Sequence, residues 1–453
     1  MFQKIQNYPV YGLHDEQTLR QFLDVMNRAE YGALMADGHL GYVMPIGGVA
    51  AYSNKVSPVG VGFDIGCGNL AVRLDILKKD LNVDLLLDRI EKYISFGIGQ
   101  TNPDAPRNHP IFDHDDWKAY EPDSLRADLK KLARDQLGTV GAGNHYVDIF
   151  SDELDRIWIG VHFGSRGLGH KTATGFINLS QDRPWNIRAI EKEVLLDLDS
   201  DLGERYYRAM RLCGAYARAG REWVCDYVAE LAGADIVERV HNHHNFAWKE
   251  KHTRAELLRH AGNGQNTDAD PKSGDRPGVN TGPGADTRLD IDARPDPHDK
   301  SSSESKNLRE YIVVRKGATP AFPGQVSFVG GSMGDPSVIL EGIDSPESRS
   351  ALYSTIHGAG RVMSRTRAAG KYKGRGKKRK QVKSGEVTPK MMKEWLDKKG
   401  VKLRGGGLDE SPHVYRRLTE VLNAHQNTIK IRHWLQPLGV VMAGPDIYDP
   451  FRD

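Results

Sequence analysis

Glycine-rich segments recur along this chain without regular alternation with helical ones, and this pattern restricts the folds that it can adopt. From Ala33 to Leu74 the chain is rich in glycine and valine, which is typical of short strands joined by glycine turns. The run IWIGVHF at 157–163 predicts a buried strand because it combines β-branched and aromatic residues. Regular alternation of strands and helices would indicate a doubly wound sheet, and this sequence lacks it. We therefore predict an α+β fold, with mixed β-sheets in a central core and helices outside.

Four segments are expected to be helical from their apolar spacing or their end signals. Residues 15–30 and 124–137 each place an apolar stripe on one face, and Ser124 can cap the second helix. A mostly helical stretch is expected over 186–231. A shorter helix is expected over 388–400, where threonine caps the start, proline occupies the first turn and glycine ends the helix.

Two segments do not have the composition of a packed core. Residues 262–307 are dominated by Gly, Pro, Asp, Ser and Asn, so they cannot bury enough apolar surface to offset the loss of chain entropy. We predict that they form a disordered insertion within the domain. Residues 371–383 hold eight Lys or Arg and no acid. This basic loop is either simply solvated or a contact for the phosphates of a nucleic acid.

Composition adds a few exclusions. The 453-residue chain has 63 Lys and Arg against 60 Asp and Glu, a formal net charge of +3, so bulk charge identifies no partner. The sequence contains no run of about 18 apolar residues and no apolar signal-peptide core near its start, so we expect no membrane association. Its three cysteines, Cys67, Cys213 and Cys225, form no CxxC pair. A reduced, cytoplasmic location is therefore expected.

Five potential metal ligands lie on four separate segments, most of them rich in glycine. Each one alone is weak evidence, because a lone histidine at a strand end is usually a hydrogen-bonded structural residue. Together they are harder to dismiss, since a buried carboxylate or thiolate needs a cation. A thiolate can bridge two ions, so a two-metal site is physically reasonable, and softness rules alone would favour Zn²⁺. The five residues are Asp64, Cys67, His145, His162 and His244.

The sequence HGAG at 357–360 predicts an anion-binding turn after a strand-like segment. His357 can present an imidazole nitrogen to a phosphate while the following backbone N–H groups cradle the oxygens. Arg361 and Arg365 would share one face if a helix begins here, and both suit bidentate phosphate contact. Histidine is a known nucleophile type, although general base is its commoner role. A structural turn that caps a helix is the plainer alternative.

The chain resembles the RtcB family of RNA ligases through an ordered set of motifs: GHLGYVMPIGGVAAY, GVGFDIGCG, LGTVGAGNH, HFGSRGLGH, HHN, RKGATPAFPG, GGSMG, HGAGRVMSR and PLGVV. The resemblance runs from about residue 33 to residue 444 and skips the segments 262–307 and 371–383. It implies one large compact RtcB-like domain over residues 1–453, with the sheets arranged around a central metal site.

The resemblance also implies an activity. Such a protein would use GTP to join RNA 3′-phosphate or 2′,3′-cyclic phosphate ends to 5′-hydroxyl ends, in tRNA splicing or RNA repair. His357 would be guanylylated, GMP would pass to the RNA 3′-phosphate, and the 5′-hydroxyl would then displace GMP. Asp37 would orient the imidazole of His357. Arg166, Arg361 and Arg365 would contact RNA phosphates, and an activating helper protein is a further partner that the sequence leaves open.

Further roles follow from the resemblance alone. Cys67 would bridge two Mn²⁺ ions. Asp64 and His145 would complete one metal site, and His162 and His244 the other. The implied guanylate contacts are Asn144, His145, Asp148, Asn245, Gly331, Ser332, Met333, Ser337, Gly358, Ala359, Gly360 and Tyr415.

Two positions depart from the family pattern. Met442 stands in PLGVVMAG where the family usually has a lysine that contacts the guanylate. Loss of that cation would weaken GTP binding or shift the nucleotide preference. Asp148 replaces a glutamate, and its shorter side chain reaches about one bond less toward the purine. Neither change affects the five ligands or His357.

Two other functions stay open from the residues. A two-metal RNA end-processing phosphodiesterase would use the same ions to activate water and would open cyclic phosphates without GTP. A non-catalytic RNA-binding protein would depend mainly on the basic run at 371–383. The complete ligand set argues against the second alternative, because a binding protein has no need of Cys67 and three histidines.

Overall fold

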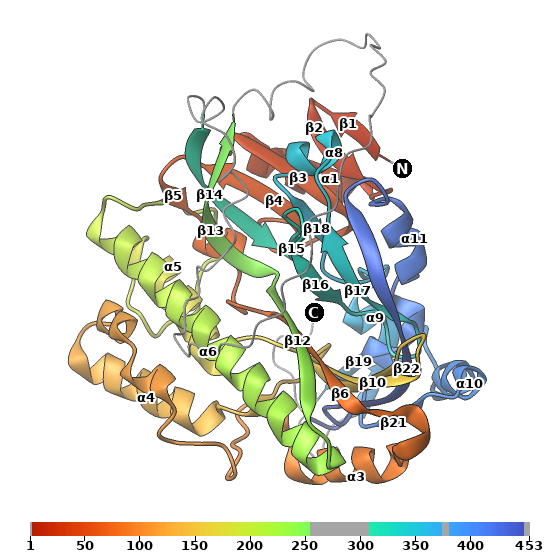
Figure 1. Ribbon diagram of the computed structural model, residues 1–453. Helices are drawn as coiled ribbons and strands as arrows, with labels where there is room; N and C mark the ends of the chain where they lie inside the picture. The colour runs from red at the N-terminus through yellow and green to blue at the C-terminus, as the bar shows by residue number, and fades with distance from the viewer. Residues whose placement is uncertain (1, 254–307, 374–379, 448–453) are drawn as a thin grey trace.

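Two mixed β-sheets form the centre of the protein, and the helices pack around them (Figure 1). The structure is a computed structural model that describes residues 2–253, 308–373 and 380–447. The insertion predicted at 262–307 lies outside these residues. None of the helices in the described ranges has the length and apolar character needed to span a bilayer. The predicted α+β class, a single domain with mixed sheets and outer helices, is confirmed.

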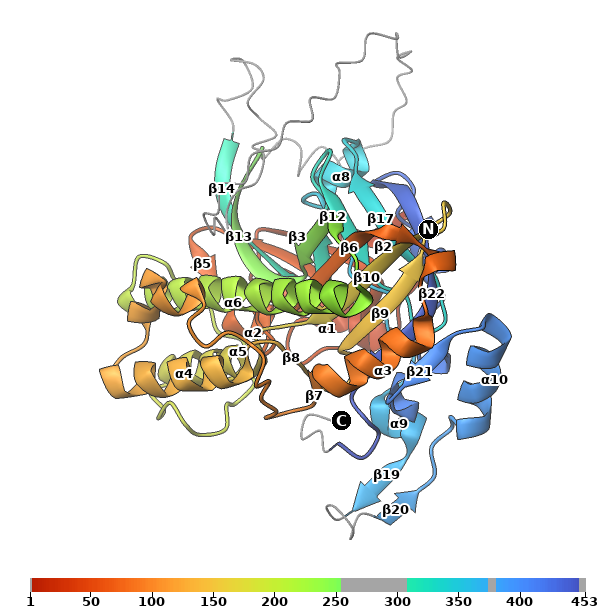
Figure 2. The ribbon, with the colours of Figure 1, turned by 60° about the horizontal axis from the view of Figure 1, so that its bottom comes forward.

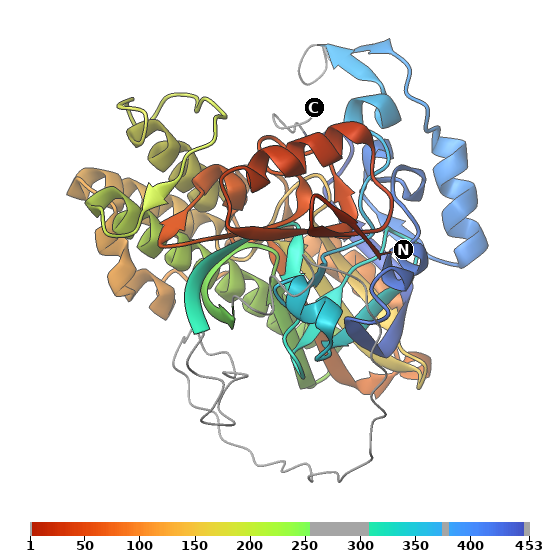
Figure 3. The ribbon, with the colours of Figure 1, turned by 90° about the horizontal axis from the view of Figure 1, so that it is seen from above.

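The six-stranded sheet has the order β1-β2-β3-β4-β14-β13. Neighbouring strands are antiparallel except β2 and β3, which run parallel. The pairing of β3 with β4 is irregular between Leu34 and His39, and Asp37 lies within that stretch. Helix α1 lies along one face of this sheet (Figure 3). The strands are β1 (Phe2–Ile5), β2 (Tyr8–Tyr11), β3 (Tyr31–His39), β4 (Ile46–Tyr52), β13 (Asn245–Thr253) and β14 (Leu308–Lys316).

The eight-stranded sheet has the order β12-β6-β10-β9-β22-β17-β16, with β21 parallel to β22 and the other neighbours antiparallel. Its register pairs His162 with both Asn69 and Tyr146, and Tyr146 with Met442. Four strands therefore bring one end each to the same edge of the sheet. The strands are β6 (Gly68–Leu77), β9 (Tyr146–Ser151), β10 (Arg156–Phe163), β12 (Ile236–His243), β16 (Val326–Val329), β17 (Ser337–Gly342), β21 (Lys402–Arg404) and β22 (Ile429–Met442).

The long helix α6 links two of the apolar cores (Figure 2). Its first half packs with residues of the six-stranded sheet, and its second half packs against β6 and β10. Helix α5 packs on α6, and α4 packs on α5. The helices are α1 (Glu16–Met26), α2 (Pro58–Val61), α3 (Val83–Tyr93), α4 (Asp123–Gln136), α5 (Arg166–Leu179), α6 (Asp201–Ala232), α8 (Pro346–Ser350), α9 (Arg365–Ala369), α10 (Pro389–Lys399) and α11 (Leu418–Asn423).

Short strand pairs complete the description. Both sheets contribute residues to a further apolar core that lies between them. The pairs are β5 (Lys55–Val56) with β11 (Leu196–Asp197), β7 (Ser95–Phe96) with β8 (Thr139–Val140), β15 (Ala318–Pro320) with β18 (Ser354–Ile356), and β19 (Lys371–Lys373) with β20 (Lys380–Lys383).

Helices α1 and α10 form with the end signals that their sequences contain. The carboxylate of Asp15 accepts a hydrogen bond from the backbone N–H of Thr18 at 2.8 Å. Thr388 caps α10 in the same way by accepting from the N–H of Met391 at 3.2 Å, and Gly400 ends that helix with a left-handed φ of 68°. The strand predicted at 157–163 is also confirmed, because it lies within β10.

Two helix predictions are wrong in detail. Helix α4 begins one residue before Ser124, because the cap position falls on a proline with extended backbone, so Ser124 is not the cap. Helix α6 begins only after Ser200, and the preceding residues 186–200 are not helical. The carbonyl of Ile187 in that stretch accepts a hydrogen bond at 2.7 Å from the side chain of Asn178 in α5, which holds this part of the chain against α5.

The basic segment at 371–383 is not a loop throughout. Its described ends pair as the antiparallel strands β19 and β20, with Lys371 opposite Lys383. Residues 374–379 lie outside the described residues. Figure 2 shows this strand pair extending away from the body beyond α9. The loop interpretation is therefore corrected for the paired ends.

Candidate active site

A cavity of about 280 Å³ opens at the edge where β6, β9, β10 and β22 end. Four predicted site residues do not line it, but each contacts a residue that does: Asp37, Arg166, Ser337 and Arg365. The predicted residues that line the cavity are Asp64, Cys67, Asn144, His145, Asp148, His162, His244, Asn245, Gly331, Ser332, Met333, His357, Gly358, Ala359, Gly360, Arg361 and Tyr415.

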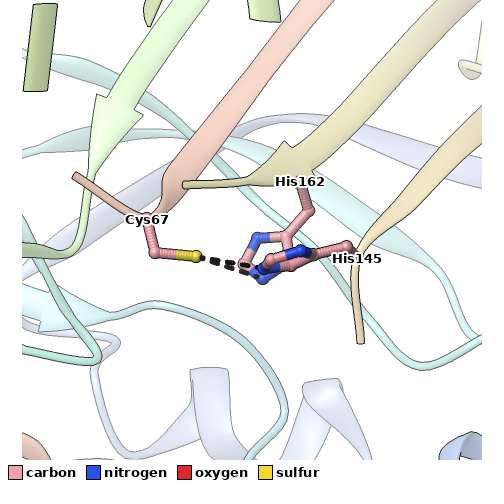
Figure 4. Close-up of side chains that lie close together, drawn as sticks. All are labelled: Cys67, His145 and His162. Atoms are coloured by element: carbon pink, nitrogen blue, oxygen red, sulfur yellow. Dashed lines mark hydrogen bonds between the residues drawn. The ribbon is translucent and has the colours of Figure 1, made fainter. Parts of the chain in front are cut away.

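Three side chains from different parts of the sheet edge converge in this cavity (Figure 4). Cys67 comes from the turn before β6, His145 from the residue before β9, and His162 from β10. The Sγ atom of Cys67 lies 3.8 Å from Nε2 of His145 and 3.7 Å from Nε2 of His162. All three donor atoms lie within 4.8 Å of one another, and a thiolate with two imidazoles is a common ligand set for a divalent metal ion. These residues therefore fit a metal ion.

The other two predicted ligands lie beside this cluster. The Oδ2 atom of Asp64 is 3.1 Å from Nε2 of His145. The ring of His244 stacks on that of His162 with centroids 5.1 Å apart, and it lies 4.9 Å from the ring of His357. Among the described residues, the buried Nδ1 atom of His244 finds no hydrogen-bond partner. The structure thus gathers all five residues and places three of them at mutual ligand distance.

Asn69 is a site residue that sequence reasoning missed. Its Nδ2 donates to the carbonyl of Phe328 at 2.9 Å, which turns its Oδ1 toward Nδ1 of His162 at 2.7 Å. The imidazole therefore carries its proton on Nδ1, and the lone pair of Nε2 faces Cys67. The only signal in the sequence was its position two residues after the cysteine.

Burial sets the protonation states around the cluster. Burial, followed by the nearby charge of Asp64, raises the pKa of the Cys67 thiol well above its usual value. Burial works to raise the pKa of Asp64, but the hydrogen bonds with His145 and Cys67 and the charges of His145 and Arg166 together outweigh it and lower that pKa to about 2. The pKa values of His162 and His244 lie well below the usual value, chiefly because both rings are buried. The two imidazoles are thus neutral and able to bind a cation.

His357 lies on the opposite wall, directly after β18, and a buried carboxylate holds its ring. Oδ2 of Asp37 is 2.5 Å from Nδ1 of His357 and also accepts the backbone N–H groups of His357 at 2.9 Å and Gly358 at 3.2 Å. Burial works to raise the pKa of Asp37, but the contact with His357 lowers it, so the carboxylate is ionised. Nδ1 is therefore a donor to Asp37, and Nε2 is left for chemistry.

Only glycine fits at the end of the HGAG turn. Gly360 has a φ of 74°, and a Cβ atom there would lie 2.3 Å from the carbonyl oxygen of Asp37. Gly358 has no such restriction, because its Cβ would meet only the carbonyl of Gly330 at 3.4 Å. The close approach of Gly360 to Asp37 keeps this turn against β3.

The predicted phosphate-binding arginines already have partners in the protein. Arg361 precedes α9, so it does not share a helical face with Arg365, which corrects that expectation. Nη1 of Arg361 is 3.0 Å from Oε2 of Glu410, and Nε of Arg365 is 3.1 Å from Oδ2 of Asp409. This pair of buried acids carries no motif that sequence reasoning could find. Arg166 lies elsewhere, with Nη1 3.2 Å from Nδ1 of His145.

A second part of the cavity is apolar and holds an acid. Met442 and Met333 belong to one buried apolar cluster that also contacts Tyr146. Asp148 lies on the same strand as Tyr146, and burial raises the pKa of its carboxyl well above the usual value. Its buried Oδ1 atom has no hydrogen-bond partner within the part of the chain that the structure describes. Met442 lies opposite Tyr146 in the register of β22 with β9, so the side chain at 442 offers no cation to this acid.

These features define a class of protein: an α+β domain whose cavity combines a cysteine–histidine metal-ligand cluster with a histidine oriented by a buried carboxylate. A sequence model of the family described as tRNA-splicing ligase RtcB matches residues 20–261 and 285–443. The chain belongs to this RtcB family.

Relatives with established names support this assignment. The chain is 31% identical to the RNA-splicing ligase RtcB of Escherichia coli (strain K12), over 74% of this chain and 75% of that protein. It is 25% identical to the tRNA-splicing ligase RtcB of Thermococcus kodakarensis, over 91% of this chain and 87% of that protein. The corresponding protein of Methanococcus maripaludis is 27% identical, with coverage of 91% and 88%.

Proposed function

We propose that this protein is an RNA ligase that uses GTP and Mn²⁺ to join RNA 3′-phosphate or 2′,3′-cyclic phosphate ends to 5′-hydroxyl ends, in tRNA splicing or RNA repair. One observation carries the proposal: His357, which Asp37 orients from behind, lines the same cavity as the cluster of Cys67, His145 and His162. A positioned nucleophile beside a metal-ligand cluster is what nucleotidyl transfer requires. The names of the relatives support ligation of RNA as the outcome.

Five residues would hold the metal ions in this proposal: Asp64, Cys67, His145, His162 and His244. Two bound ions would neutralise the non-bridging oxygens of the reacting phosphates. The assignment of Mn²⁺ comes from the family, because a sulfur- and imidazole-rich set would by itself favour a softer ion.

His357 would carry the nucleotide. Its Nε2 attacks the α-phosphorus of GTP, so that an N–P bond forms while the bond to the pyrophosphate oxygen breaks. Asp37 keeps the proton on Nδ1 and compensates the positive charge that develops on the ring. The backbone N–H groups of Ala359 and Gly360 lie in the wall beside His357, where they are candidates to bind phosphate oxygens.

Two transfers would follow. An oxygen of the RNA 3′-phosphate attacks the phosphorus on His357, which frees Nε2 and leaves GMP joined to the RNA end. The 5′-hydroxyl of the second RNA then attacks the 3′-phosphorus, and GMP departs as the new phosphodiester bond forms. A 2′,3′-cyclic phosphate must first be opened by water to a 3′-phosphate.

The remaining site residues would hold substrates. We assign the guanylate to the part of the cavity lined by Asn144, Asp148 and Tyr415, next to Met442. Further contacts would come from Asn245, Gly331, Ser332 and Met333, with Ser337 supporting the turn by accepting from the N–H of Gly331 at 3.0 Å. Arg166, Arg361 and Arg365 would bind RNA phosphates. Arg361 and Arg365 now contact the acids at 410 and 409, and they would give up part of those contacts when a phosphate binds.

Covalent labelling tests the proposal directly. The protein is incubated with α-labelled GTP and Mn²⁺ and run on a denaturing gel under non-acidic conditions, which preserve a phosphoramidate. We expect a labelled band that is absent from His357→Ala, and ATP is run in parallel because Met442 replaces a cation. Opening of cyclic phosphates without any labelled band, on protein shown to hold metal, would instead support a two-metal phosphodiesterase.

A further inference from the structure

Arg221 is a buried arginine that lies behind the metal-ligand cluster and takes no part in the chemistry proposed above. It belongs to the buried face of α6, and its side chain has no exposed surface. Nη1 donates to the carbonyl of Gly66 at 3.0 Å and also to the carbonyl of Phe163. Nη2 lies 2.8 Å from Nε2 of His241 and 3.0 Å from Nδ1 of His243. A single guanidinium thus joins three strand ends to one helix.

Three of these contacts fall on residues adjacent to candidate ligands. Gly66 precedes Cys67, Phe163 follows His162, and His243 precedes His244. These ligands come from three different strand ends, β6, β10 and β12, so no local turn sets their spacing. The backbone N–H of His244 donates to the carbonyl of Cys67 at 2.9 Å, which links two of the segments, and the guanidinium contacts all three.

The three segments need a donor at this place. The ladders of β6 with β10 and β12 end at Gly68, which pairs with Phe163 on one side and His243 on the other. The carbonyl of Gly66 therefore lies beyond the last paired residues, and that of Phe163 belongs to the last pair. Buried carbonyls require hydrogen-bond donors, and a planar guanidinium offers five in fixed directions. Burial lowers the pKa of Arg221 to about 10, so the group remains a cation at neutral pH.

Close packing of α6 brings the guanidinium within reach. A Cβ atom on Gly66 would lie 2.9 Å from the Cα of Gly214, and one on Gly214 would lie 2.6 Å from the ring of Phe246. Glycine at both positions lets the helix backbone approach the turn that carries Cys67. Arg221 follows Gly214 on the same buried face of α6. The helix and the ligand-bearing turn are thus held at one separation.

We propose that Arg221 is a positioning residue of the metal centre, which sets the spacing of Cys67, His162 and His244. It acts through the backbone carbonyls next to Cys67 and His162 and through the imidazole of His243 next to His244. It touches neither the ions nor the substrates. The inference rests on the metal centre of the proposed function and extends it to a residue outside the cavity. A lysine would keep the positive charge but lacks the planar guanidinium with its several N–H donors in fixed directions. Its single ammonium group therefore cannot reach all of the same acceptors.

Metal binding by the full-length protein provides the test. Mn²⁺ affinity is measured by titration, and Co²⁺ is used as a spectroscopic probe because thiolate ligation gives a charge-transfer band. We expect Arg221→Lys and Arg221→Met to lower the affinity about 10- to 100-fold, the range found when groups that orient metal ligands are removed. We also expect the Co²⁺–thiolate band to weaken or shift in both variants.

Arg315 provides a matched control. It is equally buried, on β14, and it contacts Glu250, Ser354 and the carbonyl of Leu352, none of which is adjacent to a candidate ligand. Arg315→Lys should lower thermal stability without changing metal affinity or the Co²⁺ spectrum. If the Arg221→Met protein does not fold, the metal affinity and the Co²⁺ spectrum of Arg221→Lys provide the test.

Two results would count against the inference in different ways. Wild-type affinity and an unchanged Co²⁺ spectrum in a folded Arg221→Lys protein would show that Arg221 only supports the core. Failure of the wild-type protein to bind either metal would remove the metal centre itself, and with it both the proposed function and this inference.

Discussion

Oδ2 of Asp37 lies 2.5 Å from Nδ1 of His357, although 320 positions separate the two residues in the sequence. The same oxygen accepts the backbone N–H of His357 at 2.9 Å, so the ring and the main chain of that residue are fixed by one buried carboxylate. Asparagine at position 37 would remove the negative charge while keeping a side chain of nearly the same shape in this place.

Asp37→Asn is therefore expected to slow formation of the labelled histidine roughly a hundredfold or more. The amide lacks the charge that compensates the ring, and its NH₂ group can turn toward Nδ1 and reverse the tautomer. The measurement is the initial rate of labelling with α-labelled GTP, with circular dichroism as a check of folding. A wild-type rate in this variant would mean that Asp37 is only structural.

Metal affinity should rise with pH. Without metal the Cys67 thiol is protonated at neutral pH, because burial raises its pKa, whereas a bound metal requires the thiolate. Binding of the ion that ligates Cys67 then releases the thiol proton, and the affinity for that ion increases about tenfold per pH unit below the thiol pKa. Asp64, with a pKa of about 2, adds nothing to this slope.

Titrations with Mn²⁺ at pH 6.5, 7.5 and 8.5 would measure the slope, and Cys67→Ser serves as the comparison. The serine hydroxyl does not ionise in this range, so the variant should bind more weakly and with a flatter dependence. An equal slope in both proteins would assign the released proton to another group.

Met442→Lys is expected to favour GTP. The backbone register places Met442 opposite Tyr146 and Val440 opposite Asp148, so a lysine at 442 lies one pair along the same face from an unpaired buried acid. An ion pair there would stabilise the lysine and supply a cation for the acceptor atoms of guanine. We expect the KM for GTP in the labelling reaction to fall about tenfold, in line with one hydrogen bond to a charged group.

Met442→Leu keeps the apolar cluster and should leave the KM near the wild-type value. The KM for ATP is measured in both variants, since adenine lacks the guanine carbonyl. Equal changes for the two nucleotides would show that the substitution acts on packing and not on recognition of the base.

Gly360→Ala should destabilise the protein while Gly358→Ala should not. Alanine at 360 places its Cβ 2.3 Å from the carbonyl oxygen of Asp37 at a positive φ, whereas alanine at 358 meets ordinary contact distances. Strain and clash of this kind cost about 1–3 kcal/mol in the free energy of unfolding. Urea denaturation of the two variants measures the difference, and equal stabilities would contradict the close approach of this turn to β3.

The sequence predicted features that depend on neighbouring residues. The predicted cap of α10, Thr388, accepts from an N–H group only three residues further along, so its signal lies within one turn of chain. The strand β10 could also be predicted, because its β-branched and aromatic residues lie next to one another in the sequence. The start of α6 could not, because the residues before the cap at Ser200 have helical composition but are held against α5 by a contact from Asn178.

The candidate site divides in the same way. Motif residues such as Cys67, His162 and His357 could be named in advance, because each lies in a short glycine-bearing segment of distinctive sequence. The residues that hold these side chains in place could not be named from the sequence. Asn69, Arg221 and the acids at 409 and 410 carry no motif, and their partners are up to 259 residues away.

The sequence by itself determined the chemical groups, the local turns and the class of fold, since these follow from residue type and short-range spacing. Only the tertiary structure decided which groups meet. Register in the eight-stranded sheet sets His162 opposite Asn69, and the approach of α6 places Arg221 behind three strand ends. Such meetings depend on long-range packing, in which many weak contacts act together, and no segment of the chain contains that information alone.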